Sequence, residues 1–286
     1  MYHVGFSDVV VNNYISMLEL LMQAIINFNY NSVILRAGGH YLPTSRTGFV
    51  LTRKTLVSES IKANFTNIDM IKTENNLLTK PCSDFLSEIS SVSNNDINRK
   101  FTEIVKFIEE MIIDGKLLID EETNDFMYKP NGVEEKIPMF LSSGVITEMT
   151  PLLLLLKYKR HVSTIMMEEP EMCLHPKLQW LIARALIQIV NNSTSVVITT
   201  HSDTIIQHVN NMIKLNNNGN KFELMKKYDY YDQDLLKEDQ IIMYQFDVDN
   251  HKTKIKEVKS GEYGFEAETF NKMLMSLLEE SREFEE

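Results

Sequence analysis

The chain has 286 residues, which is enough for about two average domains or one large α/β domain. Hydrophobic residues make up 43% of it and charged residues 24%, so the composition is globular and excludes a wholly disordered chain. The formal net charge of −11 disfavours a protein that binds nucleic acid with its whole surface. The two cysteines, Cys82 and Cys173, are too few for a disulfide framework or a zinc site, and they fit a reducing compartment.

Signals for secretion or membrane insertion are absent from the sequence. The longest purely apolar run, Leu152 to Leu156, is much shorter than the roughly 20 residues that a membrane span needs, so we interpret it as part of a buried helix. The first ten residues lack a basic segment followed by a long apolar one, which argues against secretion. The sequence therefore predicts a cytoplasmic protein with no membrane part.

The first 130 residues read mainly as helices. Apolar residues at helical spacing predict helices over 14–28, 55–64, 83–92 and 101–112. A short run with β-branched residues predicts a strand over 33–36, whereas Pro43 and Gly48 mark residues 40–51 as a loop. Apolar runs on either side of a polar tip predict a β-hairpin over 116–130.

Strands and helices alternate between about residue 141 and residue 206. Apolar runs predict buried strands over 162–167 and 196–200, with a helix over 177–190 between them, and this order is typical of a parallel sheet covered on both faces. Further along the chain we expect strands over 241–246 and 253–258 and a helix over 266–280. The predicted fold class is therefore α/β, with a mostly parallel core sheet flanked by helices, a helical insertion and a small β-hairpin.

Two adjacent glutamates follow the strand predicted over 162–167. Glu168 and Glu169 should lie at the carboxyl edge of the sheet, where ligands bind in open α/β folds. Because neighbouring side chains on an extended chain point to opposite sides, the two carboxylates would have different tasks. Glu168 can bind Mg²⁺, and Glu169 can polarise a water that attacks a phosphate. The plain alternative is a solvated strand end, which the flanking apolar run and the PExxLHP continuation disfavour.

Two other segments contain groups that suit a phosphate. His201 follows the strand predicted over 196–200, and a neutral imidazole there can hydrogen-bond a phosphate oxygen or the attacking water. Taken alone, such a histidine is more often a core or capping residue, and Ser202 or Asp203 makes a plain helix cap. The small residues of LSSGV (141–145) lead into a helix whose first N–H groups suit an anion, although such a motif taken alone is more often a plain helix cap at Ser142.

In this order and spacing, these segments resemble the motifs of ATP-binding-cassette (ABC) ATPases. LSSGV resembles their signature loop, IMMEEPE their Walker B strand with its catalytic glutamate, CLHP their D-loop, and TTHSD their switch-histidine segment. The EEPExxLHP and TTHSD forms are typical of the SMC-like branch, which includes bacterial AAA-type ATPases related to the overcoming-lysogenisation-defect (OLD) proteins. YLPTSRTG and the closing EYGFEAETFNKML are similar to segments of the same branch.

The resemblance implies ATP and Mg²⁺ as cofactors and a role for each matching residue. Glu168 matches the Mg²⁺-associated carboxylate, Glu169 the general base and His201 the switch histidine that senses the γ-phosphate. The nucleotide-contacting residues of the signature and D-loop match Ser142, Ser143, Gly144 and His175. In this family the signature loop touches the nucleotide that the opposite protomer holds.

One motif of the family is missing from these 286 residues. A P-loop, GxxxxGK[ST], supplies the backbone nest and the lysine that hold the β- and γ-phosphates, and no segment here matches it. The resemblance then implies the C-terminal portion of such an ATPase. We expect residues 1–51 to be a remnant that links to the missing lobe, 52–115 a helical insertion, and 116–286 the core. The sequence leaves open a truncated chain, a split gene product and a natural half-protein.

The resemblance implies an ATPase module of the SMC-like class that acts in DNA maintenance or phage defence. It would hydrolyse ATP only with a P-loop-bearing half or a second protomer in a head-to-tail dimer, and the isolated chain would be inactive. A nuclease or another effector, and DNA through the complex, are the further partners implied. The alternative is a non-catalytic regulatory or dimerisation lobe that does not bind ATP productively.

Overall fold

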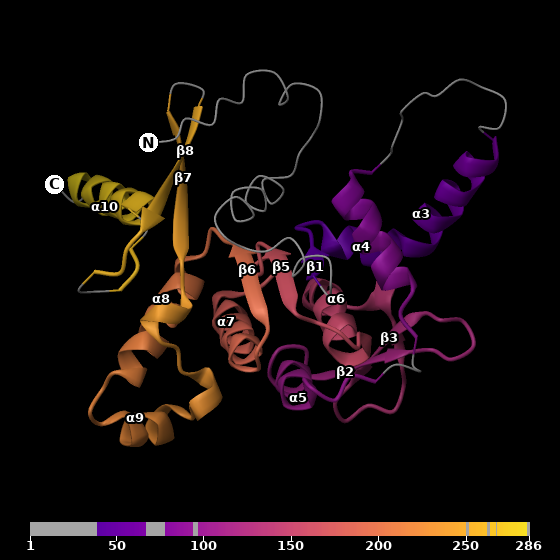
Figure 1. Cartoon of the computed structure of the whole chain (residues 1–286), viewed down its shortest axis with the longest axis horizontal. Helices are drawn as coiled ribbons and strands as arrows, with labels where there is room; N and C mark the ends of the chain where they lie inside the picture. The colour runs from indigo at the N-terminus through magenta and orange to yellow at the C-terminus, as the bar shows by residue number, and fades with distance from the viewer. Residues whose placement is uncertain are drawn as a thin grey trace. The chain divides into compact units, whose positions relative to one another are not determined.

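The computed structural model describes residues 39–66, 78–93, 97–249, 252–261, 264–266 and 268–284. The described chain divides into two compact units, and Figure 1 shows the elements of both. The first unit contains the described residues up to Leu174 together with 192–200, and the second contains 175–191 and the described residues from His201 onward. The helix predicted over 14–28 and the strand predicted over 33–36 lie outside the described residues.

A parallel three-stranded sheet lies at the centre of the first unit. Its order is β1 (Gly39–Leu42), β5 (Thr164–Glu168) and β6 (Ser195–Thr199), and both neighbouring pairs run parallel. The central strand β5 is buried over its first four residues, as expected for a parallel sheet that is covered on its faces. This arrangement confirms the predicted α/β class and the two predicted central strands.

The prediction of a loop over residues 40–51 is wrong. Residues 39–42 form β1, and α3 (Arg46–Thr66) begins only three residues after Pro43. The pairing of β1 with β5 explains the difference, because a partner far along the chain fixes a strand that its own mixed composition does not indicate. Pro43 does lie outside regular secondary structure, in the short connection between β1 and α3.

The first unit also contains α3, α4 (Lys80–Ser90), α5 (Thr102–Met111) and α6 (Gly144–Tyr158), and in Figure 1 α3 and α4 lie on the β1 side of this sheet. Helix α6 is buried from Ile146 to Leu156, and residues 152–156 are at most 4% exposed, which confirms that the apolar run belongs to a buried helix. It packs against α3 and α5. Because α6 begins at Gly144, within LSSGV, its packed core anchors that segment.

The predicted hairpin is present as β2 (Gly115–Ile119) and β3 (Phe126–Pro130), to which β4 (Ile137–Pro138) adds a short third strand. Two cations of α3 bind the tip of this hairpin. Arg53 donates a hydrogen bond to the carbonyl of Asn124 at 2.6 Å, and Lys54 pairs with Asp125 at 2.6 Å. The hairpin is therefore attached to the helices of the first unit.

The second unit contains α7 (Pro176–Asn191), α8 (Asp203–Asn216), α9 (Lys221–Tyr228) and α10 (Glu268–Glu283). Its apolar core gathers residues from α7, α8, α9 and the segment that follows: Ile187, Met212, Ile213, Leu215, Met225, Leu235, Leu236 and Phe265. A buried ion pair joins Arg184 to Asp234 at 2.8 Å, and Gln188 donates to the same carboxylate at 2.7 Å. Ser202 caps α8 by accepting a hydrogen bond from the backbone N–H of Ile205, as expected from the sequence.

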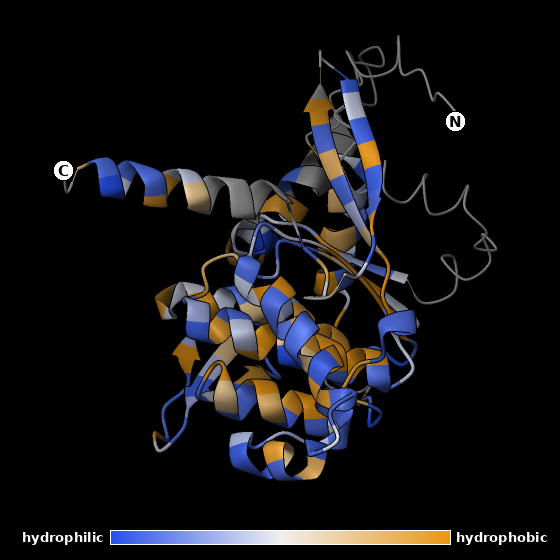
Figure 2. Cartoon of the chain, turned by 90° about the vertical axis from the view of Figure 1, so that its left-hand side faces the viewer, coloured by the Kyte–Doolittle hydropathy of each residue, from blue (hydrophilic) through white to orange (hydrophobic). Residues whose placement is uncertain are grey.

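Strands β7 (Met243–Asp249) and β8 (Lys252–Val258) form an antiparallel ribbon, which confirms the two strands predicted near the end of the chain. Phe246 pairs with Ile255 and Asp247 with Lys254, and Figure 2 shows hydrophobic and hydrophilic residues mixed along the ribbon. In the part of the chain that the structure describes, no helix is both long and apolar enough to cross a membrane.

Candidate active site

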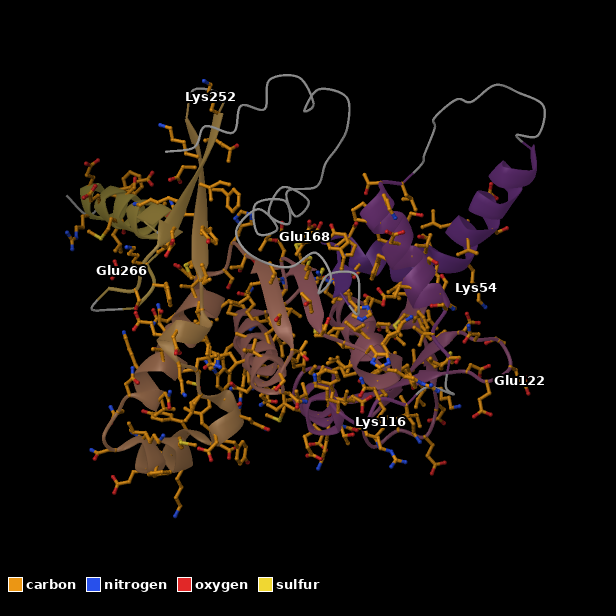
Figure 3. The ribbon with its side chains drawn as sticks, in the orientation of Figure 1. Lys54, Lys116, Glu122, Glu168, Lys252 and Glu266 are labelled. Atoms are coloured by element: carbon orange, nitrogen blue, oxygen red, sulfur yellow. The ribbon has the colours of Figure 1, made fainter. Side chains whose placement is uncertain are left out.

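Glu168 is the last residue of β5, at the carboxyl end of the central strand (Figure 3). Its carboxylate is half-buried and is held by two groups from the segment around β1. The hydroxyl of Tyr41 donates to Oε1 at 2.9 Å, and the backbone N–H of Thr44 donates to Oε2 at 3.3 Å. Each oxygen keeps a lone pair beyond these bonds, so the carboxylate can still coordinate a hard cation.

Glu169 leaves the strand in a left-handed backbone conformation, with φ of 40°. Its backbone N–H donates to the carbonyl of Thr199 on β6 at 2.9 Å. From the sequence, Glu168 and Glu169 are expected to alternate along an extended strand. That expectation is wrong, because the strand ends at Glu168 and the turn before Pro170 reorients Glu169. Within the described residues, no group donates a hydrogen bond to the Glu169 carboxylate.

Arg46, the first residue of α3, holds the backbone at this strand end. Its guanidinium is fully buried and donates to the carbonyl of Glu169 at 3.0 Å, and also to the carbonyl of Glu168. The same guanidinium forms a buried ion pair with Glu148 of α6. Burial lowers the pKa of Arg46 from its ordinary value, while the neighbouring carboxylates, chiefly Glu148, oppose that shift. Arg46 therefore connects the start of α3, the end of β5 and α6.

Sequence reasoning missed Arg46, Glu148 and Tyr41 as parts of this site. Arg46 lies within YLPTSRTG, and Glu148 lies three residues after the signature-like loop LSSGV. The signal that the sequence offered was the charge of Arg46 and of Glu148, each of which lies in a segment that is buried in the folded chain. A charged side chain in such a segment either extends to solvent or forms a buried ion pair, and the sequence alone does not distinguish these two outcomes.

The predicted signature residues form the start of α6. Ser143 occupies the N-cap position, and its carbonyl accepts the first helical hydrogen bonds from Ile146 and Thr147. Its side chain makes no capping hydrogen bond, and Ser142 ends the preceding 3₁₀ turn, so the alternative that Ser142 is the helix cap is wrong. Ser143 and Gly144 are exposed. The first N–H groups of a long buried helix thus lie beside the exposed Ser143, an arrangement that suits an anion.

His175 and His201 belong to the second unit, so the structure does not bring them together with the two glutamates in one unit. His175 is exposed and precedes α7, where its carbonyl accepts hydrogen bonds from the N–H groups of Leu178 and Gln179 at 2.7 and 3.0 Å. His201 is exposed and stands two residues before α8. Their assigned roles remain predictions.

The described residues contain no group of three or more His, Cys, Asp or Glu side chains that would enclose a metal. A complete protein cage is not what Mg²⁺ needs at a phosphate site, because it usually binds one or two carboxylates and keeps its other positions for water and substrate phosphates. Glu168, oriented by Tyr41 and Thr44 and still partly accessible, fits that requirement.

The sequence is similar to a known family of ATPases. The AAA ATPase domain family matches residues 45–206, which is more than half of the chain and contains Arg46, the signature-like loop, both glutamates and His201. No curated protein matches the sequence. A solved structure from work on ATP-driven dimerization and DNA-stimulated activation of SMC ATPases matches 70% of this chain and 96% of its own chain, with 12% identity and a TM-score of 0.37. At that TM-score the likeness supports no conclusion about this chain.

Proposed function

Since the chain belongs to the AAA ATPase domain family, we propose that it is the portion of an ATP-hydrolysing enzyme that supplies the catalytic carboxylates. One observation carries this proposal. Two glutamates follow each other at the carboxyl end of the central parallel strand, one oriented by two hydrogen bonds and the other fixed only through its backbone. This is the difference in environment that a metal-binding carboxylate and a general base require.

In the proposed reaction, Glu169 accepts a proton from a water that attacks the γ-phosphate in line. The new bond joins the water oxygen to the γ-phosphorus, and the bond to the β-phosphate oxygen breaks, which yields ADP and phosphate. Glu168 would hold Mg²⁺, which offsets phosphate charge when bound. His201 would hydrogen-bond a γ-phosphate oxygen or the attacking water, as the sequence resemblance implies.

The signature-like loop provides the second part of the proposal. Ser142, Ser143 and Gly144 precede or begin a helix whose exposed start suits an anion, and we assign to them, and to His175, contact with a nucleotide that a second protomer holds. A head-to-tail dimer follows from that assignment. The OLD-related branch, a role in DNA maintenance or phage defence, and a nuclease or DNA as partners rest on the sequence resemblance alone. A cytoplasmic location rests on the composition, in which two cysteines fit a reducing compartment.

The 286 residues contain no P-loop, and this defines the experiment. The chain is expressed with and without a P-loop-bearing half from the same ATPase, and phosphate release from ATP is measured with Mg²⁺. We expect turnover only from the combination. The competing function, a regulatory or dimerisation lobe, predicts that the combination assembles but hydrolyses ATP no faster than the P-loop half alone, and that result would overturn the proposal.

A further inference from the structure

A partly buried polar path runs from the signature-like loop toward the two glutamates, inside the first unit. At its outer end, the hydroxyl of Thr147 donates to the carbonyl of Gly144 at 3.0 Å. Thr47 donates its hydroxyl proton to Glu148 at 2.8 Å, and because both threonine protons are then used, the 3.3 Å between the hydroxyl oxygens of Thr147 and Thr47 is a packing contact. These contacts join the first turn of α6 to the start of α3.

The inner end of the path is the guanidinium of Arg46. The side chains of Arg46 and Glu148 are 0% and 1% exposed and form an ion pair. Arg46 also donates to the carbonyls of Glu168 and Glu169 and to that of Pro43. Separating a buried ion pair strongly destabilises the folded state, because it leaves each charge buried without a partner. Arg46 and Glu148 are therefore constrained to move together.

The buried pair of Arg46 and Glu148 restrains the backbone of Glu169. A residue other than glycine in the left-handed region persists only where its surroundings hold it there. Arg46 holds the carbonyl of Glu169, and Thr199 holds its N–H. A displacement of Arg46 would therefore change the orientation of the Glu169 side chain.

We propose that Arg46 is a positioning residue for Glu169, and that Thr147, Thr47, Glu148 and Arg46 couple the signature-like loop to this carboxylate within one protomer. Engagement of Ser142–Gly144 by a partner's nucleotide would then stabilise the backbone that carries the base on the engaged chain. The link to catalysis rests on the proposed function; the coupling between loop and backbone does not.

Arg53 provides a matched control, because it also lies in α3, is buried and donates to main-chain carbonyls. Its acceptors are Ile89 and Asn124, which are not part of the path. A purely structural role for buried arginines in α3 predicts that Arg46→Lys and Arg53→Lys behave alike. The proposed role predicts that only Arg46→Lys affects the segment around Glu169.

The first test is amide hydrogen exchange on the full chain without nucleotide, followed in the peptide that covers residues 168–174. We expect Arg46→Lys, and also Thr47→Val, to accelerate exchange there by about ten-fold, the effect of losing roughly one hydrogen bond to a charged group. Arg53→Lys should leave this peptide unchanged. Thr147→Val should accelerate exchange as well, and its effect should not add to that of Arg46→Lys, as a double-mutant cycle reveals. Unchanged exchange in Arg46→Lys, or additive effects in the cycle, would overturn the coupling.

The second test uses the ATPase completed by its P-loop-bearing half. Arg46→Lys should lower kcat by at least about ten-fold and leave KM for ATP unchanged, because only the base is misplaced. Arg53→Lys should retain the wild-type kcat. If the wild type does not hydrolyse ATP, the proposed function fails while the exchange result still decides the coupling. If exchange changes but kcat does not, the positioning role of Arg46 is refuted.

Discussion

The backbone of Glu169 is fixed from both sides while its carboxylate has no hydrogen-bond donor among the described residues. Its N–H donates to Thr199 and its carbonyl accepts from Arg46, so the left-handed turn, which costs about 1–3 kcal/mol, is held in place. Glu168 has the opposite arrangement, with its two carboxylate oxygens bonded to Tyr41 and Thr44. The first environment suits a base and the second a metal-binding carboxylate.

A single buried histidine of the second unit predicts a pH dependence of stability. His208 is 2% exposed, lies beside Trp180 and Tyr230, and has no hydrogen-bond partner at Nε2 within the described residues. Burial lowers the pKa of His208 to about 4 from 6.5, an effect that nearby Asp234 only partly opposes. The unfolded chain therefore binds more protons, and stability is lost as the pH falls from about 6.5 toward 4.

We expect the free energy of unfolding to be about 2 kcal/mol lower at pH 5 than at pH 7.5 from this group alone. Urea unfolding at the two pH values measures the difference, and His208→Phe should remove most of it, whatever its own effect on stability. His175→Gln, at an exposed position, serves as the control. A difference that persists unchanged in His208→Phe would assign the pH dependence to other groups.

The helices and strands that could be predicted from the sequence are those whose type is determined by their own residues. The strands of β5 and β6 and the buried helix α6 follow from continuous apolar runs, and their existence is confirmed. Strand β1 was missed because its pairing with β5 is distant in the chain. The same reason applies to the site: the adjacent glutamates were visible as a pattern, but the buried pair of Arg46 and Glu148 joins residues about a hundred positions apart.

The start of α6 predicts the effect of a minimal substitution at Gly144. A Cβ at this position would lie 3.7 Å from the Cβ of Cys173, which is ordinary contact, so nothing within the described chain requires glycine there. We expect the free energy of unfolding of Gly144→Ala to lie within about 0.5 kcal/mol of the wild-type value or slightly above it, because alanine has a higher helix propensity than glycine. If the loop contacts a partner's nucleotide closely, the same variant should lose at least about ten-fold in ATP-dependent assembly, equivalent to about 1.4 kcal/mol.

Sedimentation of the completed ATPase with and without ATP measures this assembly. Gly48→Ala is the matched control, because Gly48 lies in helix α3 and a Cβ there would meet nothing within 4 Å. Equal assembly by the Gly144→Ala variant and the wild type would remove the assigned role of the loop.

For the whole chain, the charge and the missing P-loop together predict weak nucleotide binding. The net charge is −11, and two glutamates lie where a polyphosphate would have to bind, without the lysine and backbone nest of a P-loop. We expect this chain alone to bind ATP–Mg²⁺ with a Kd no tighter than about 1 mM, or roughly −4 kcal/mol. Calorimetric titration of the 286-residue chain measures it, and micromolar binding would reveal a phosphate site outside the residues assigned here.

The measurement that tests the central claim most directly is hydrolysis by the completed ATPase carrying Glu169→Gln. Glutamine keeps the size of the side chain and removes the basic carboxylate, so ATP should still bind while kcat falls by at least about 100-fold and uncleaved ATP accumulates on the protein. Glu122→Gln, at the exposed tip of the β2–β3 hairpin (Figure 3), makes the same chemical change away from the site and should leave kcat unaltered. Hydrolysis by Glu169→Gln at the wild-type rate would contradict the assignment of Glu169 as the base.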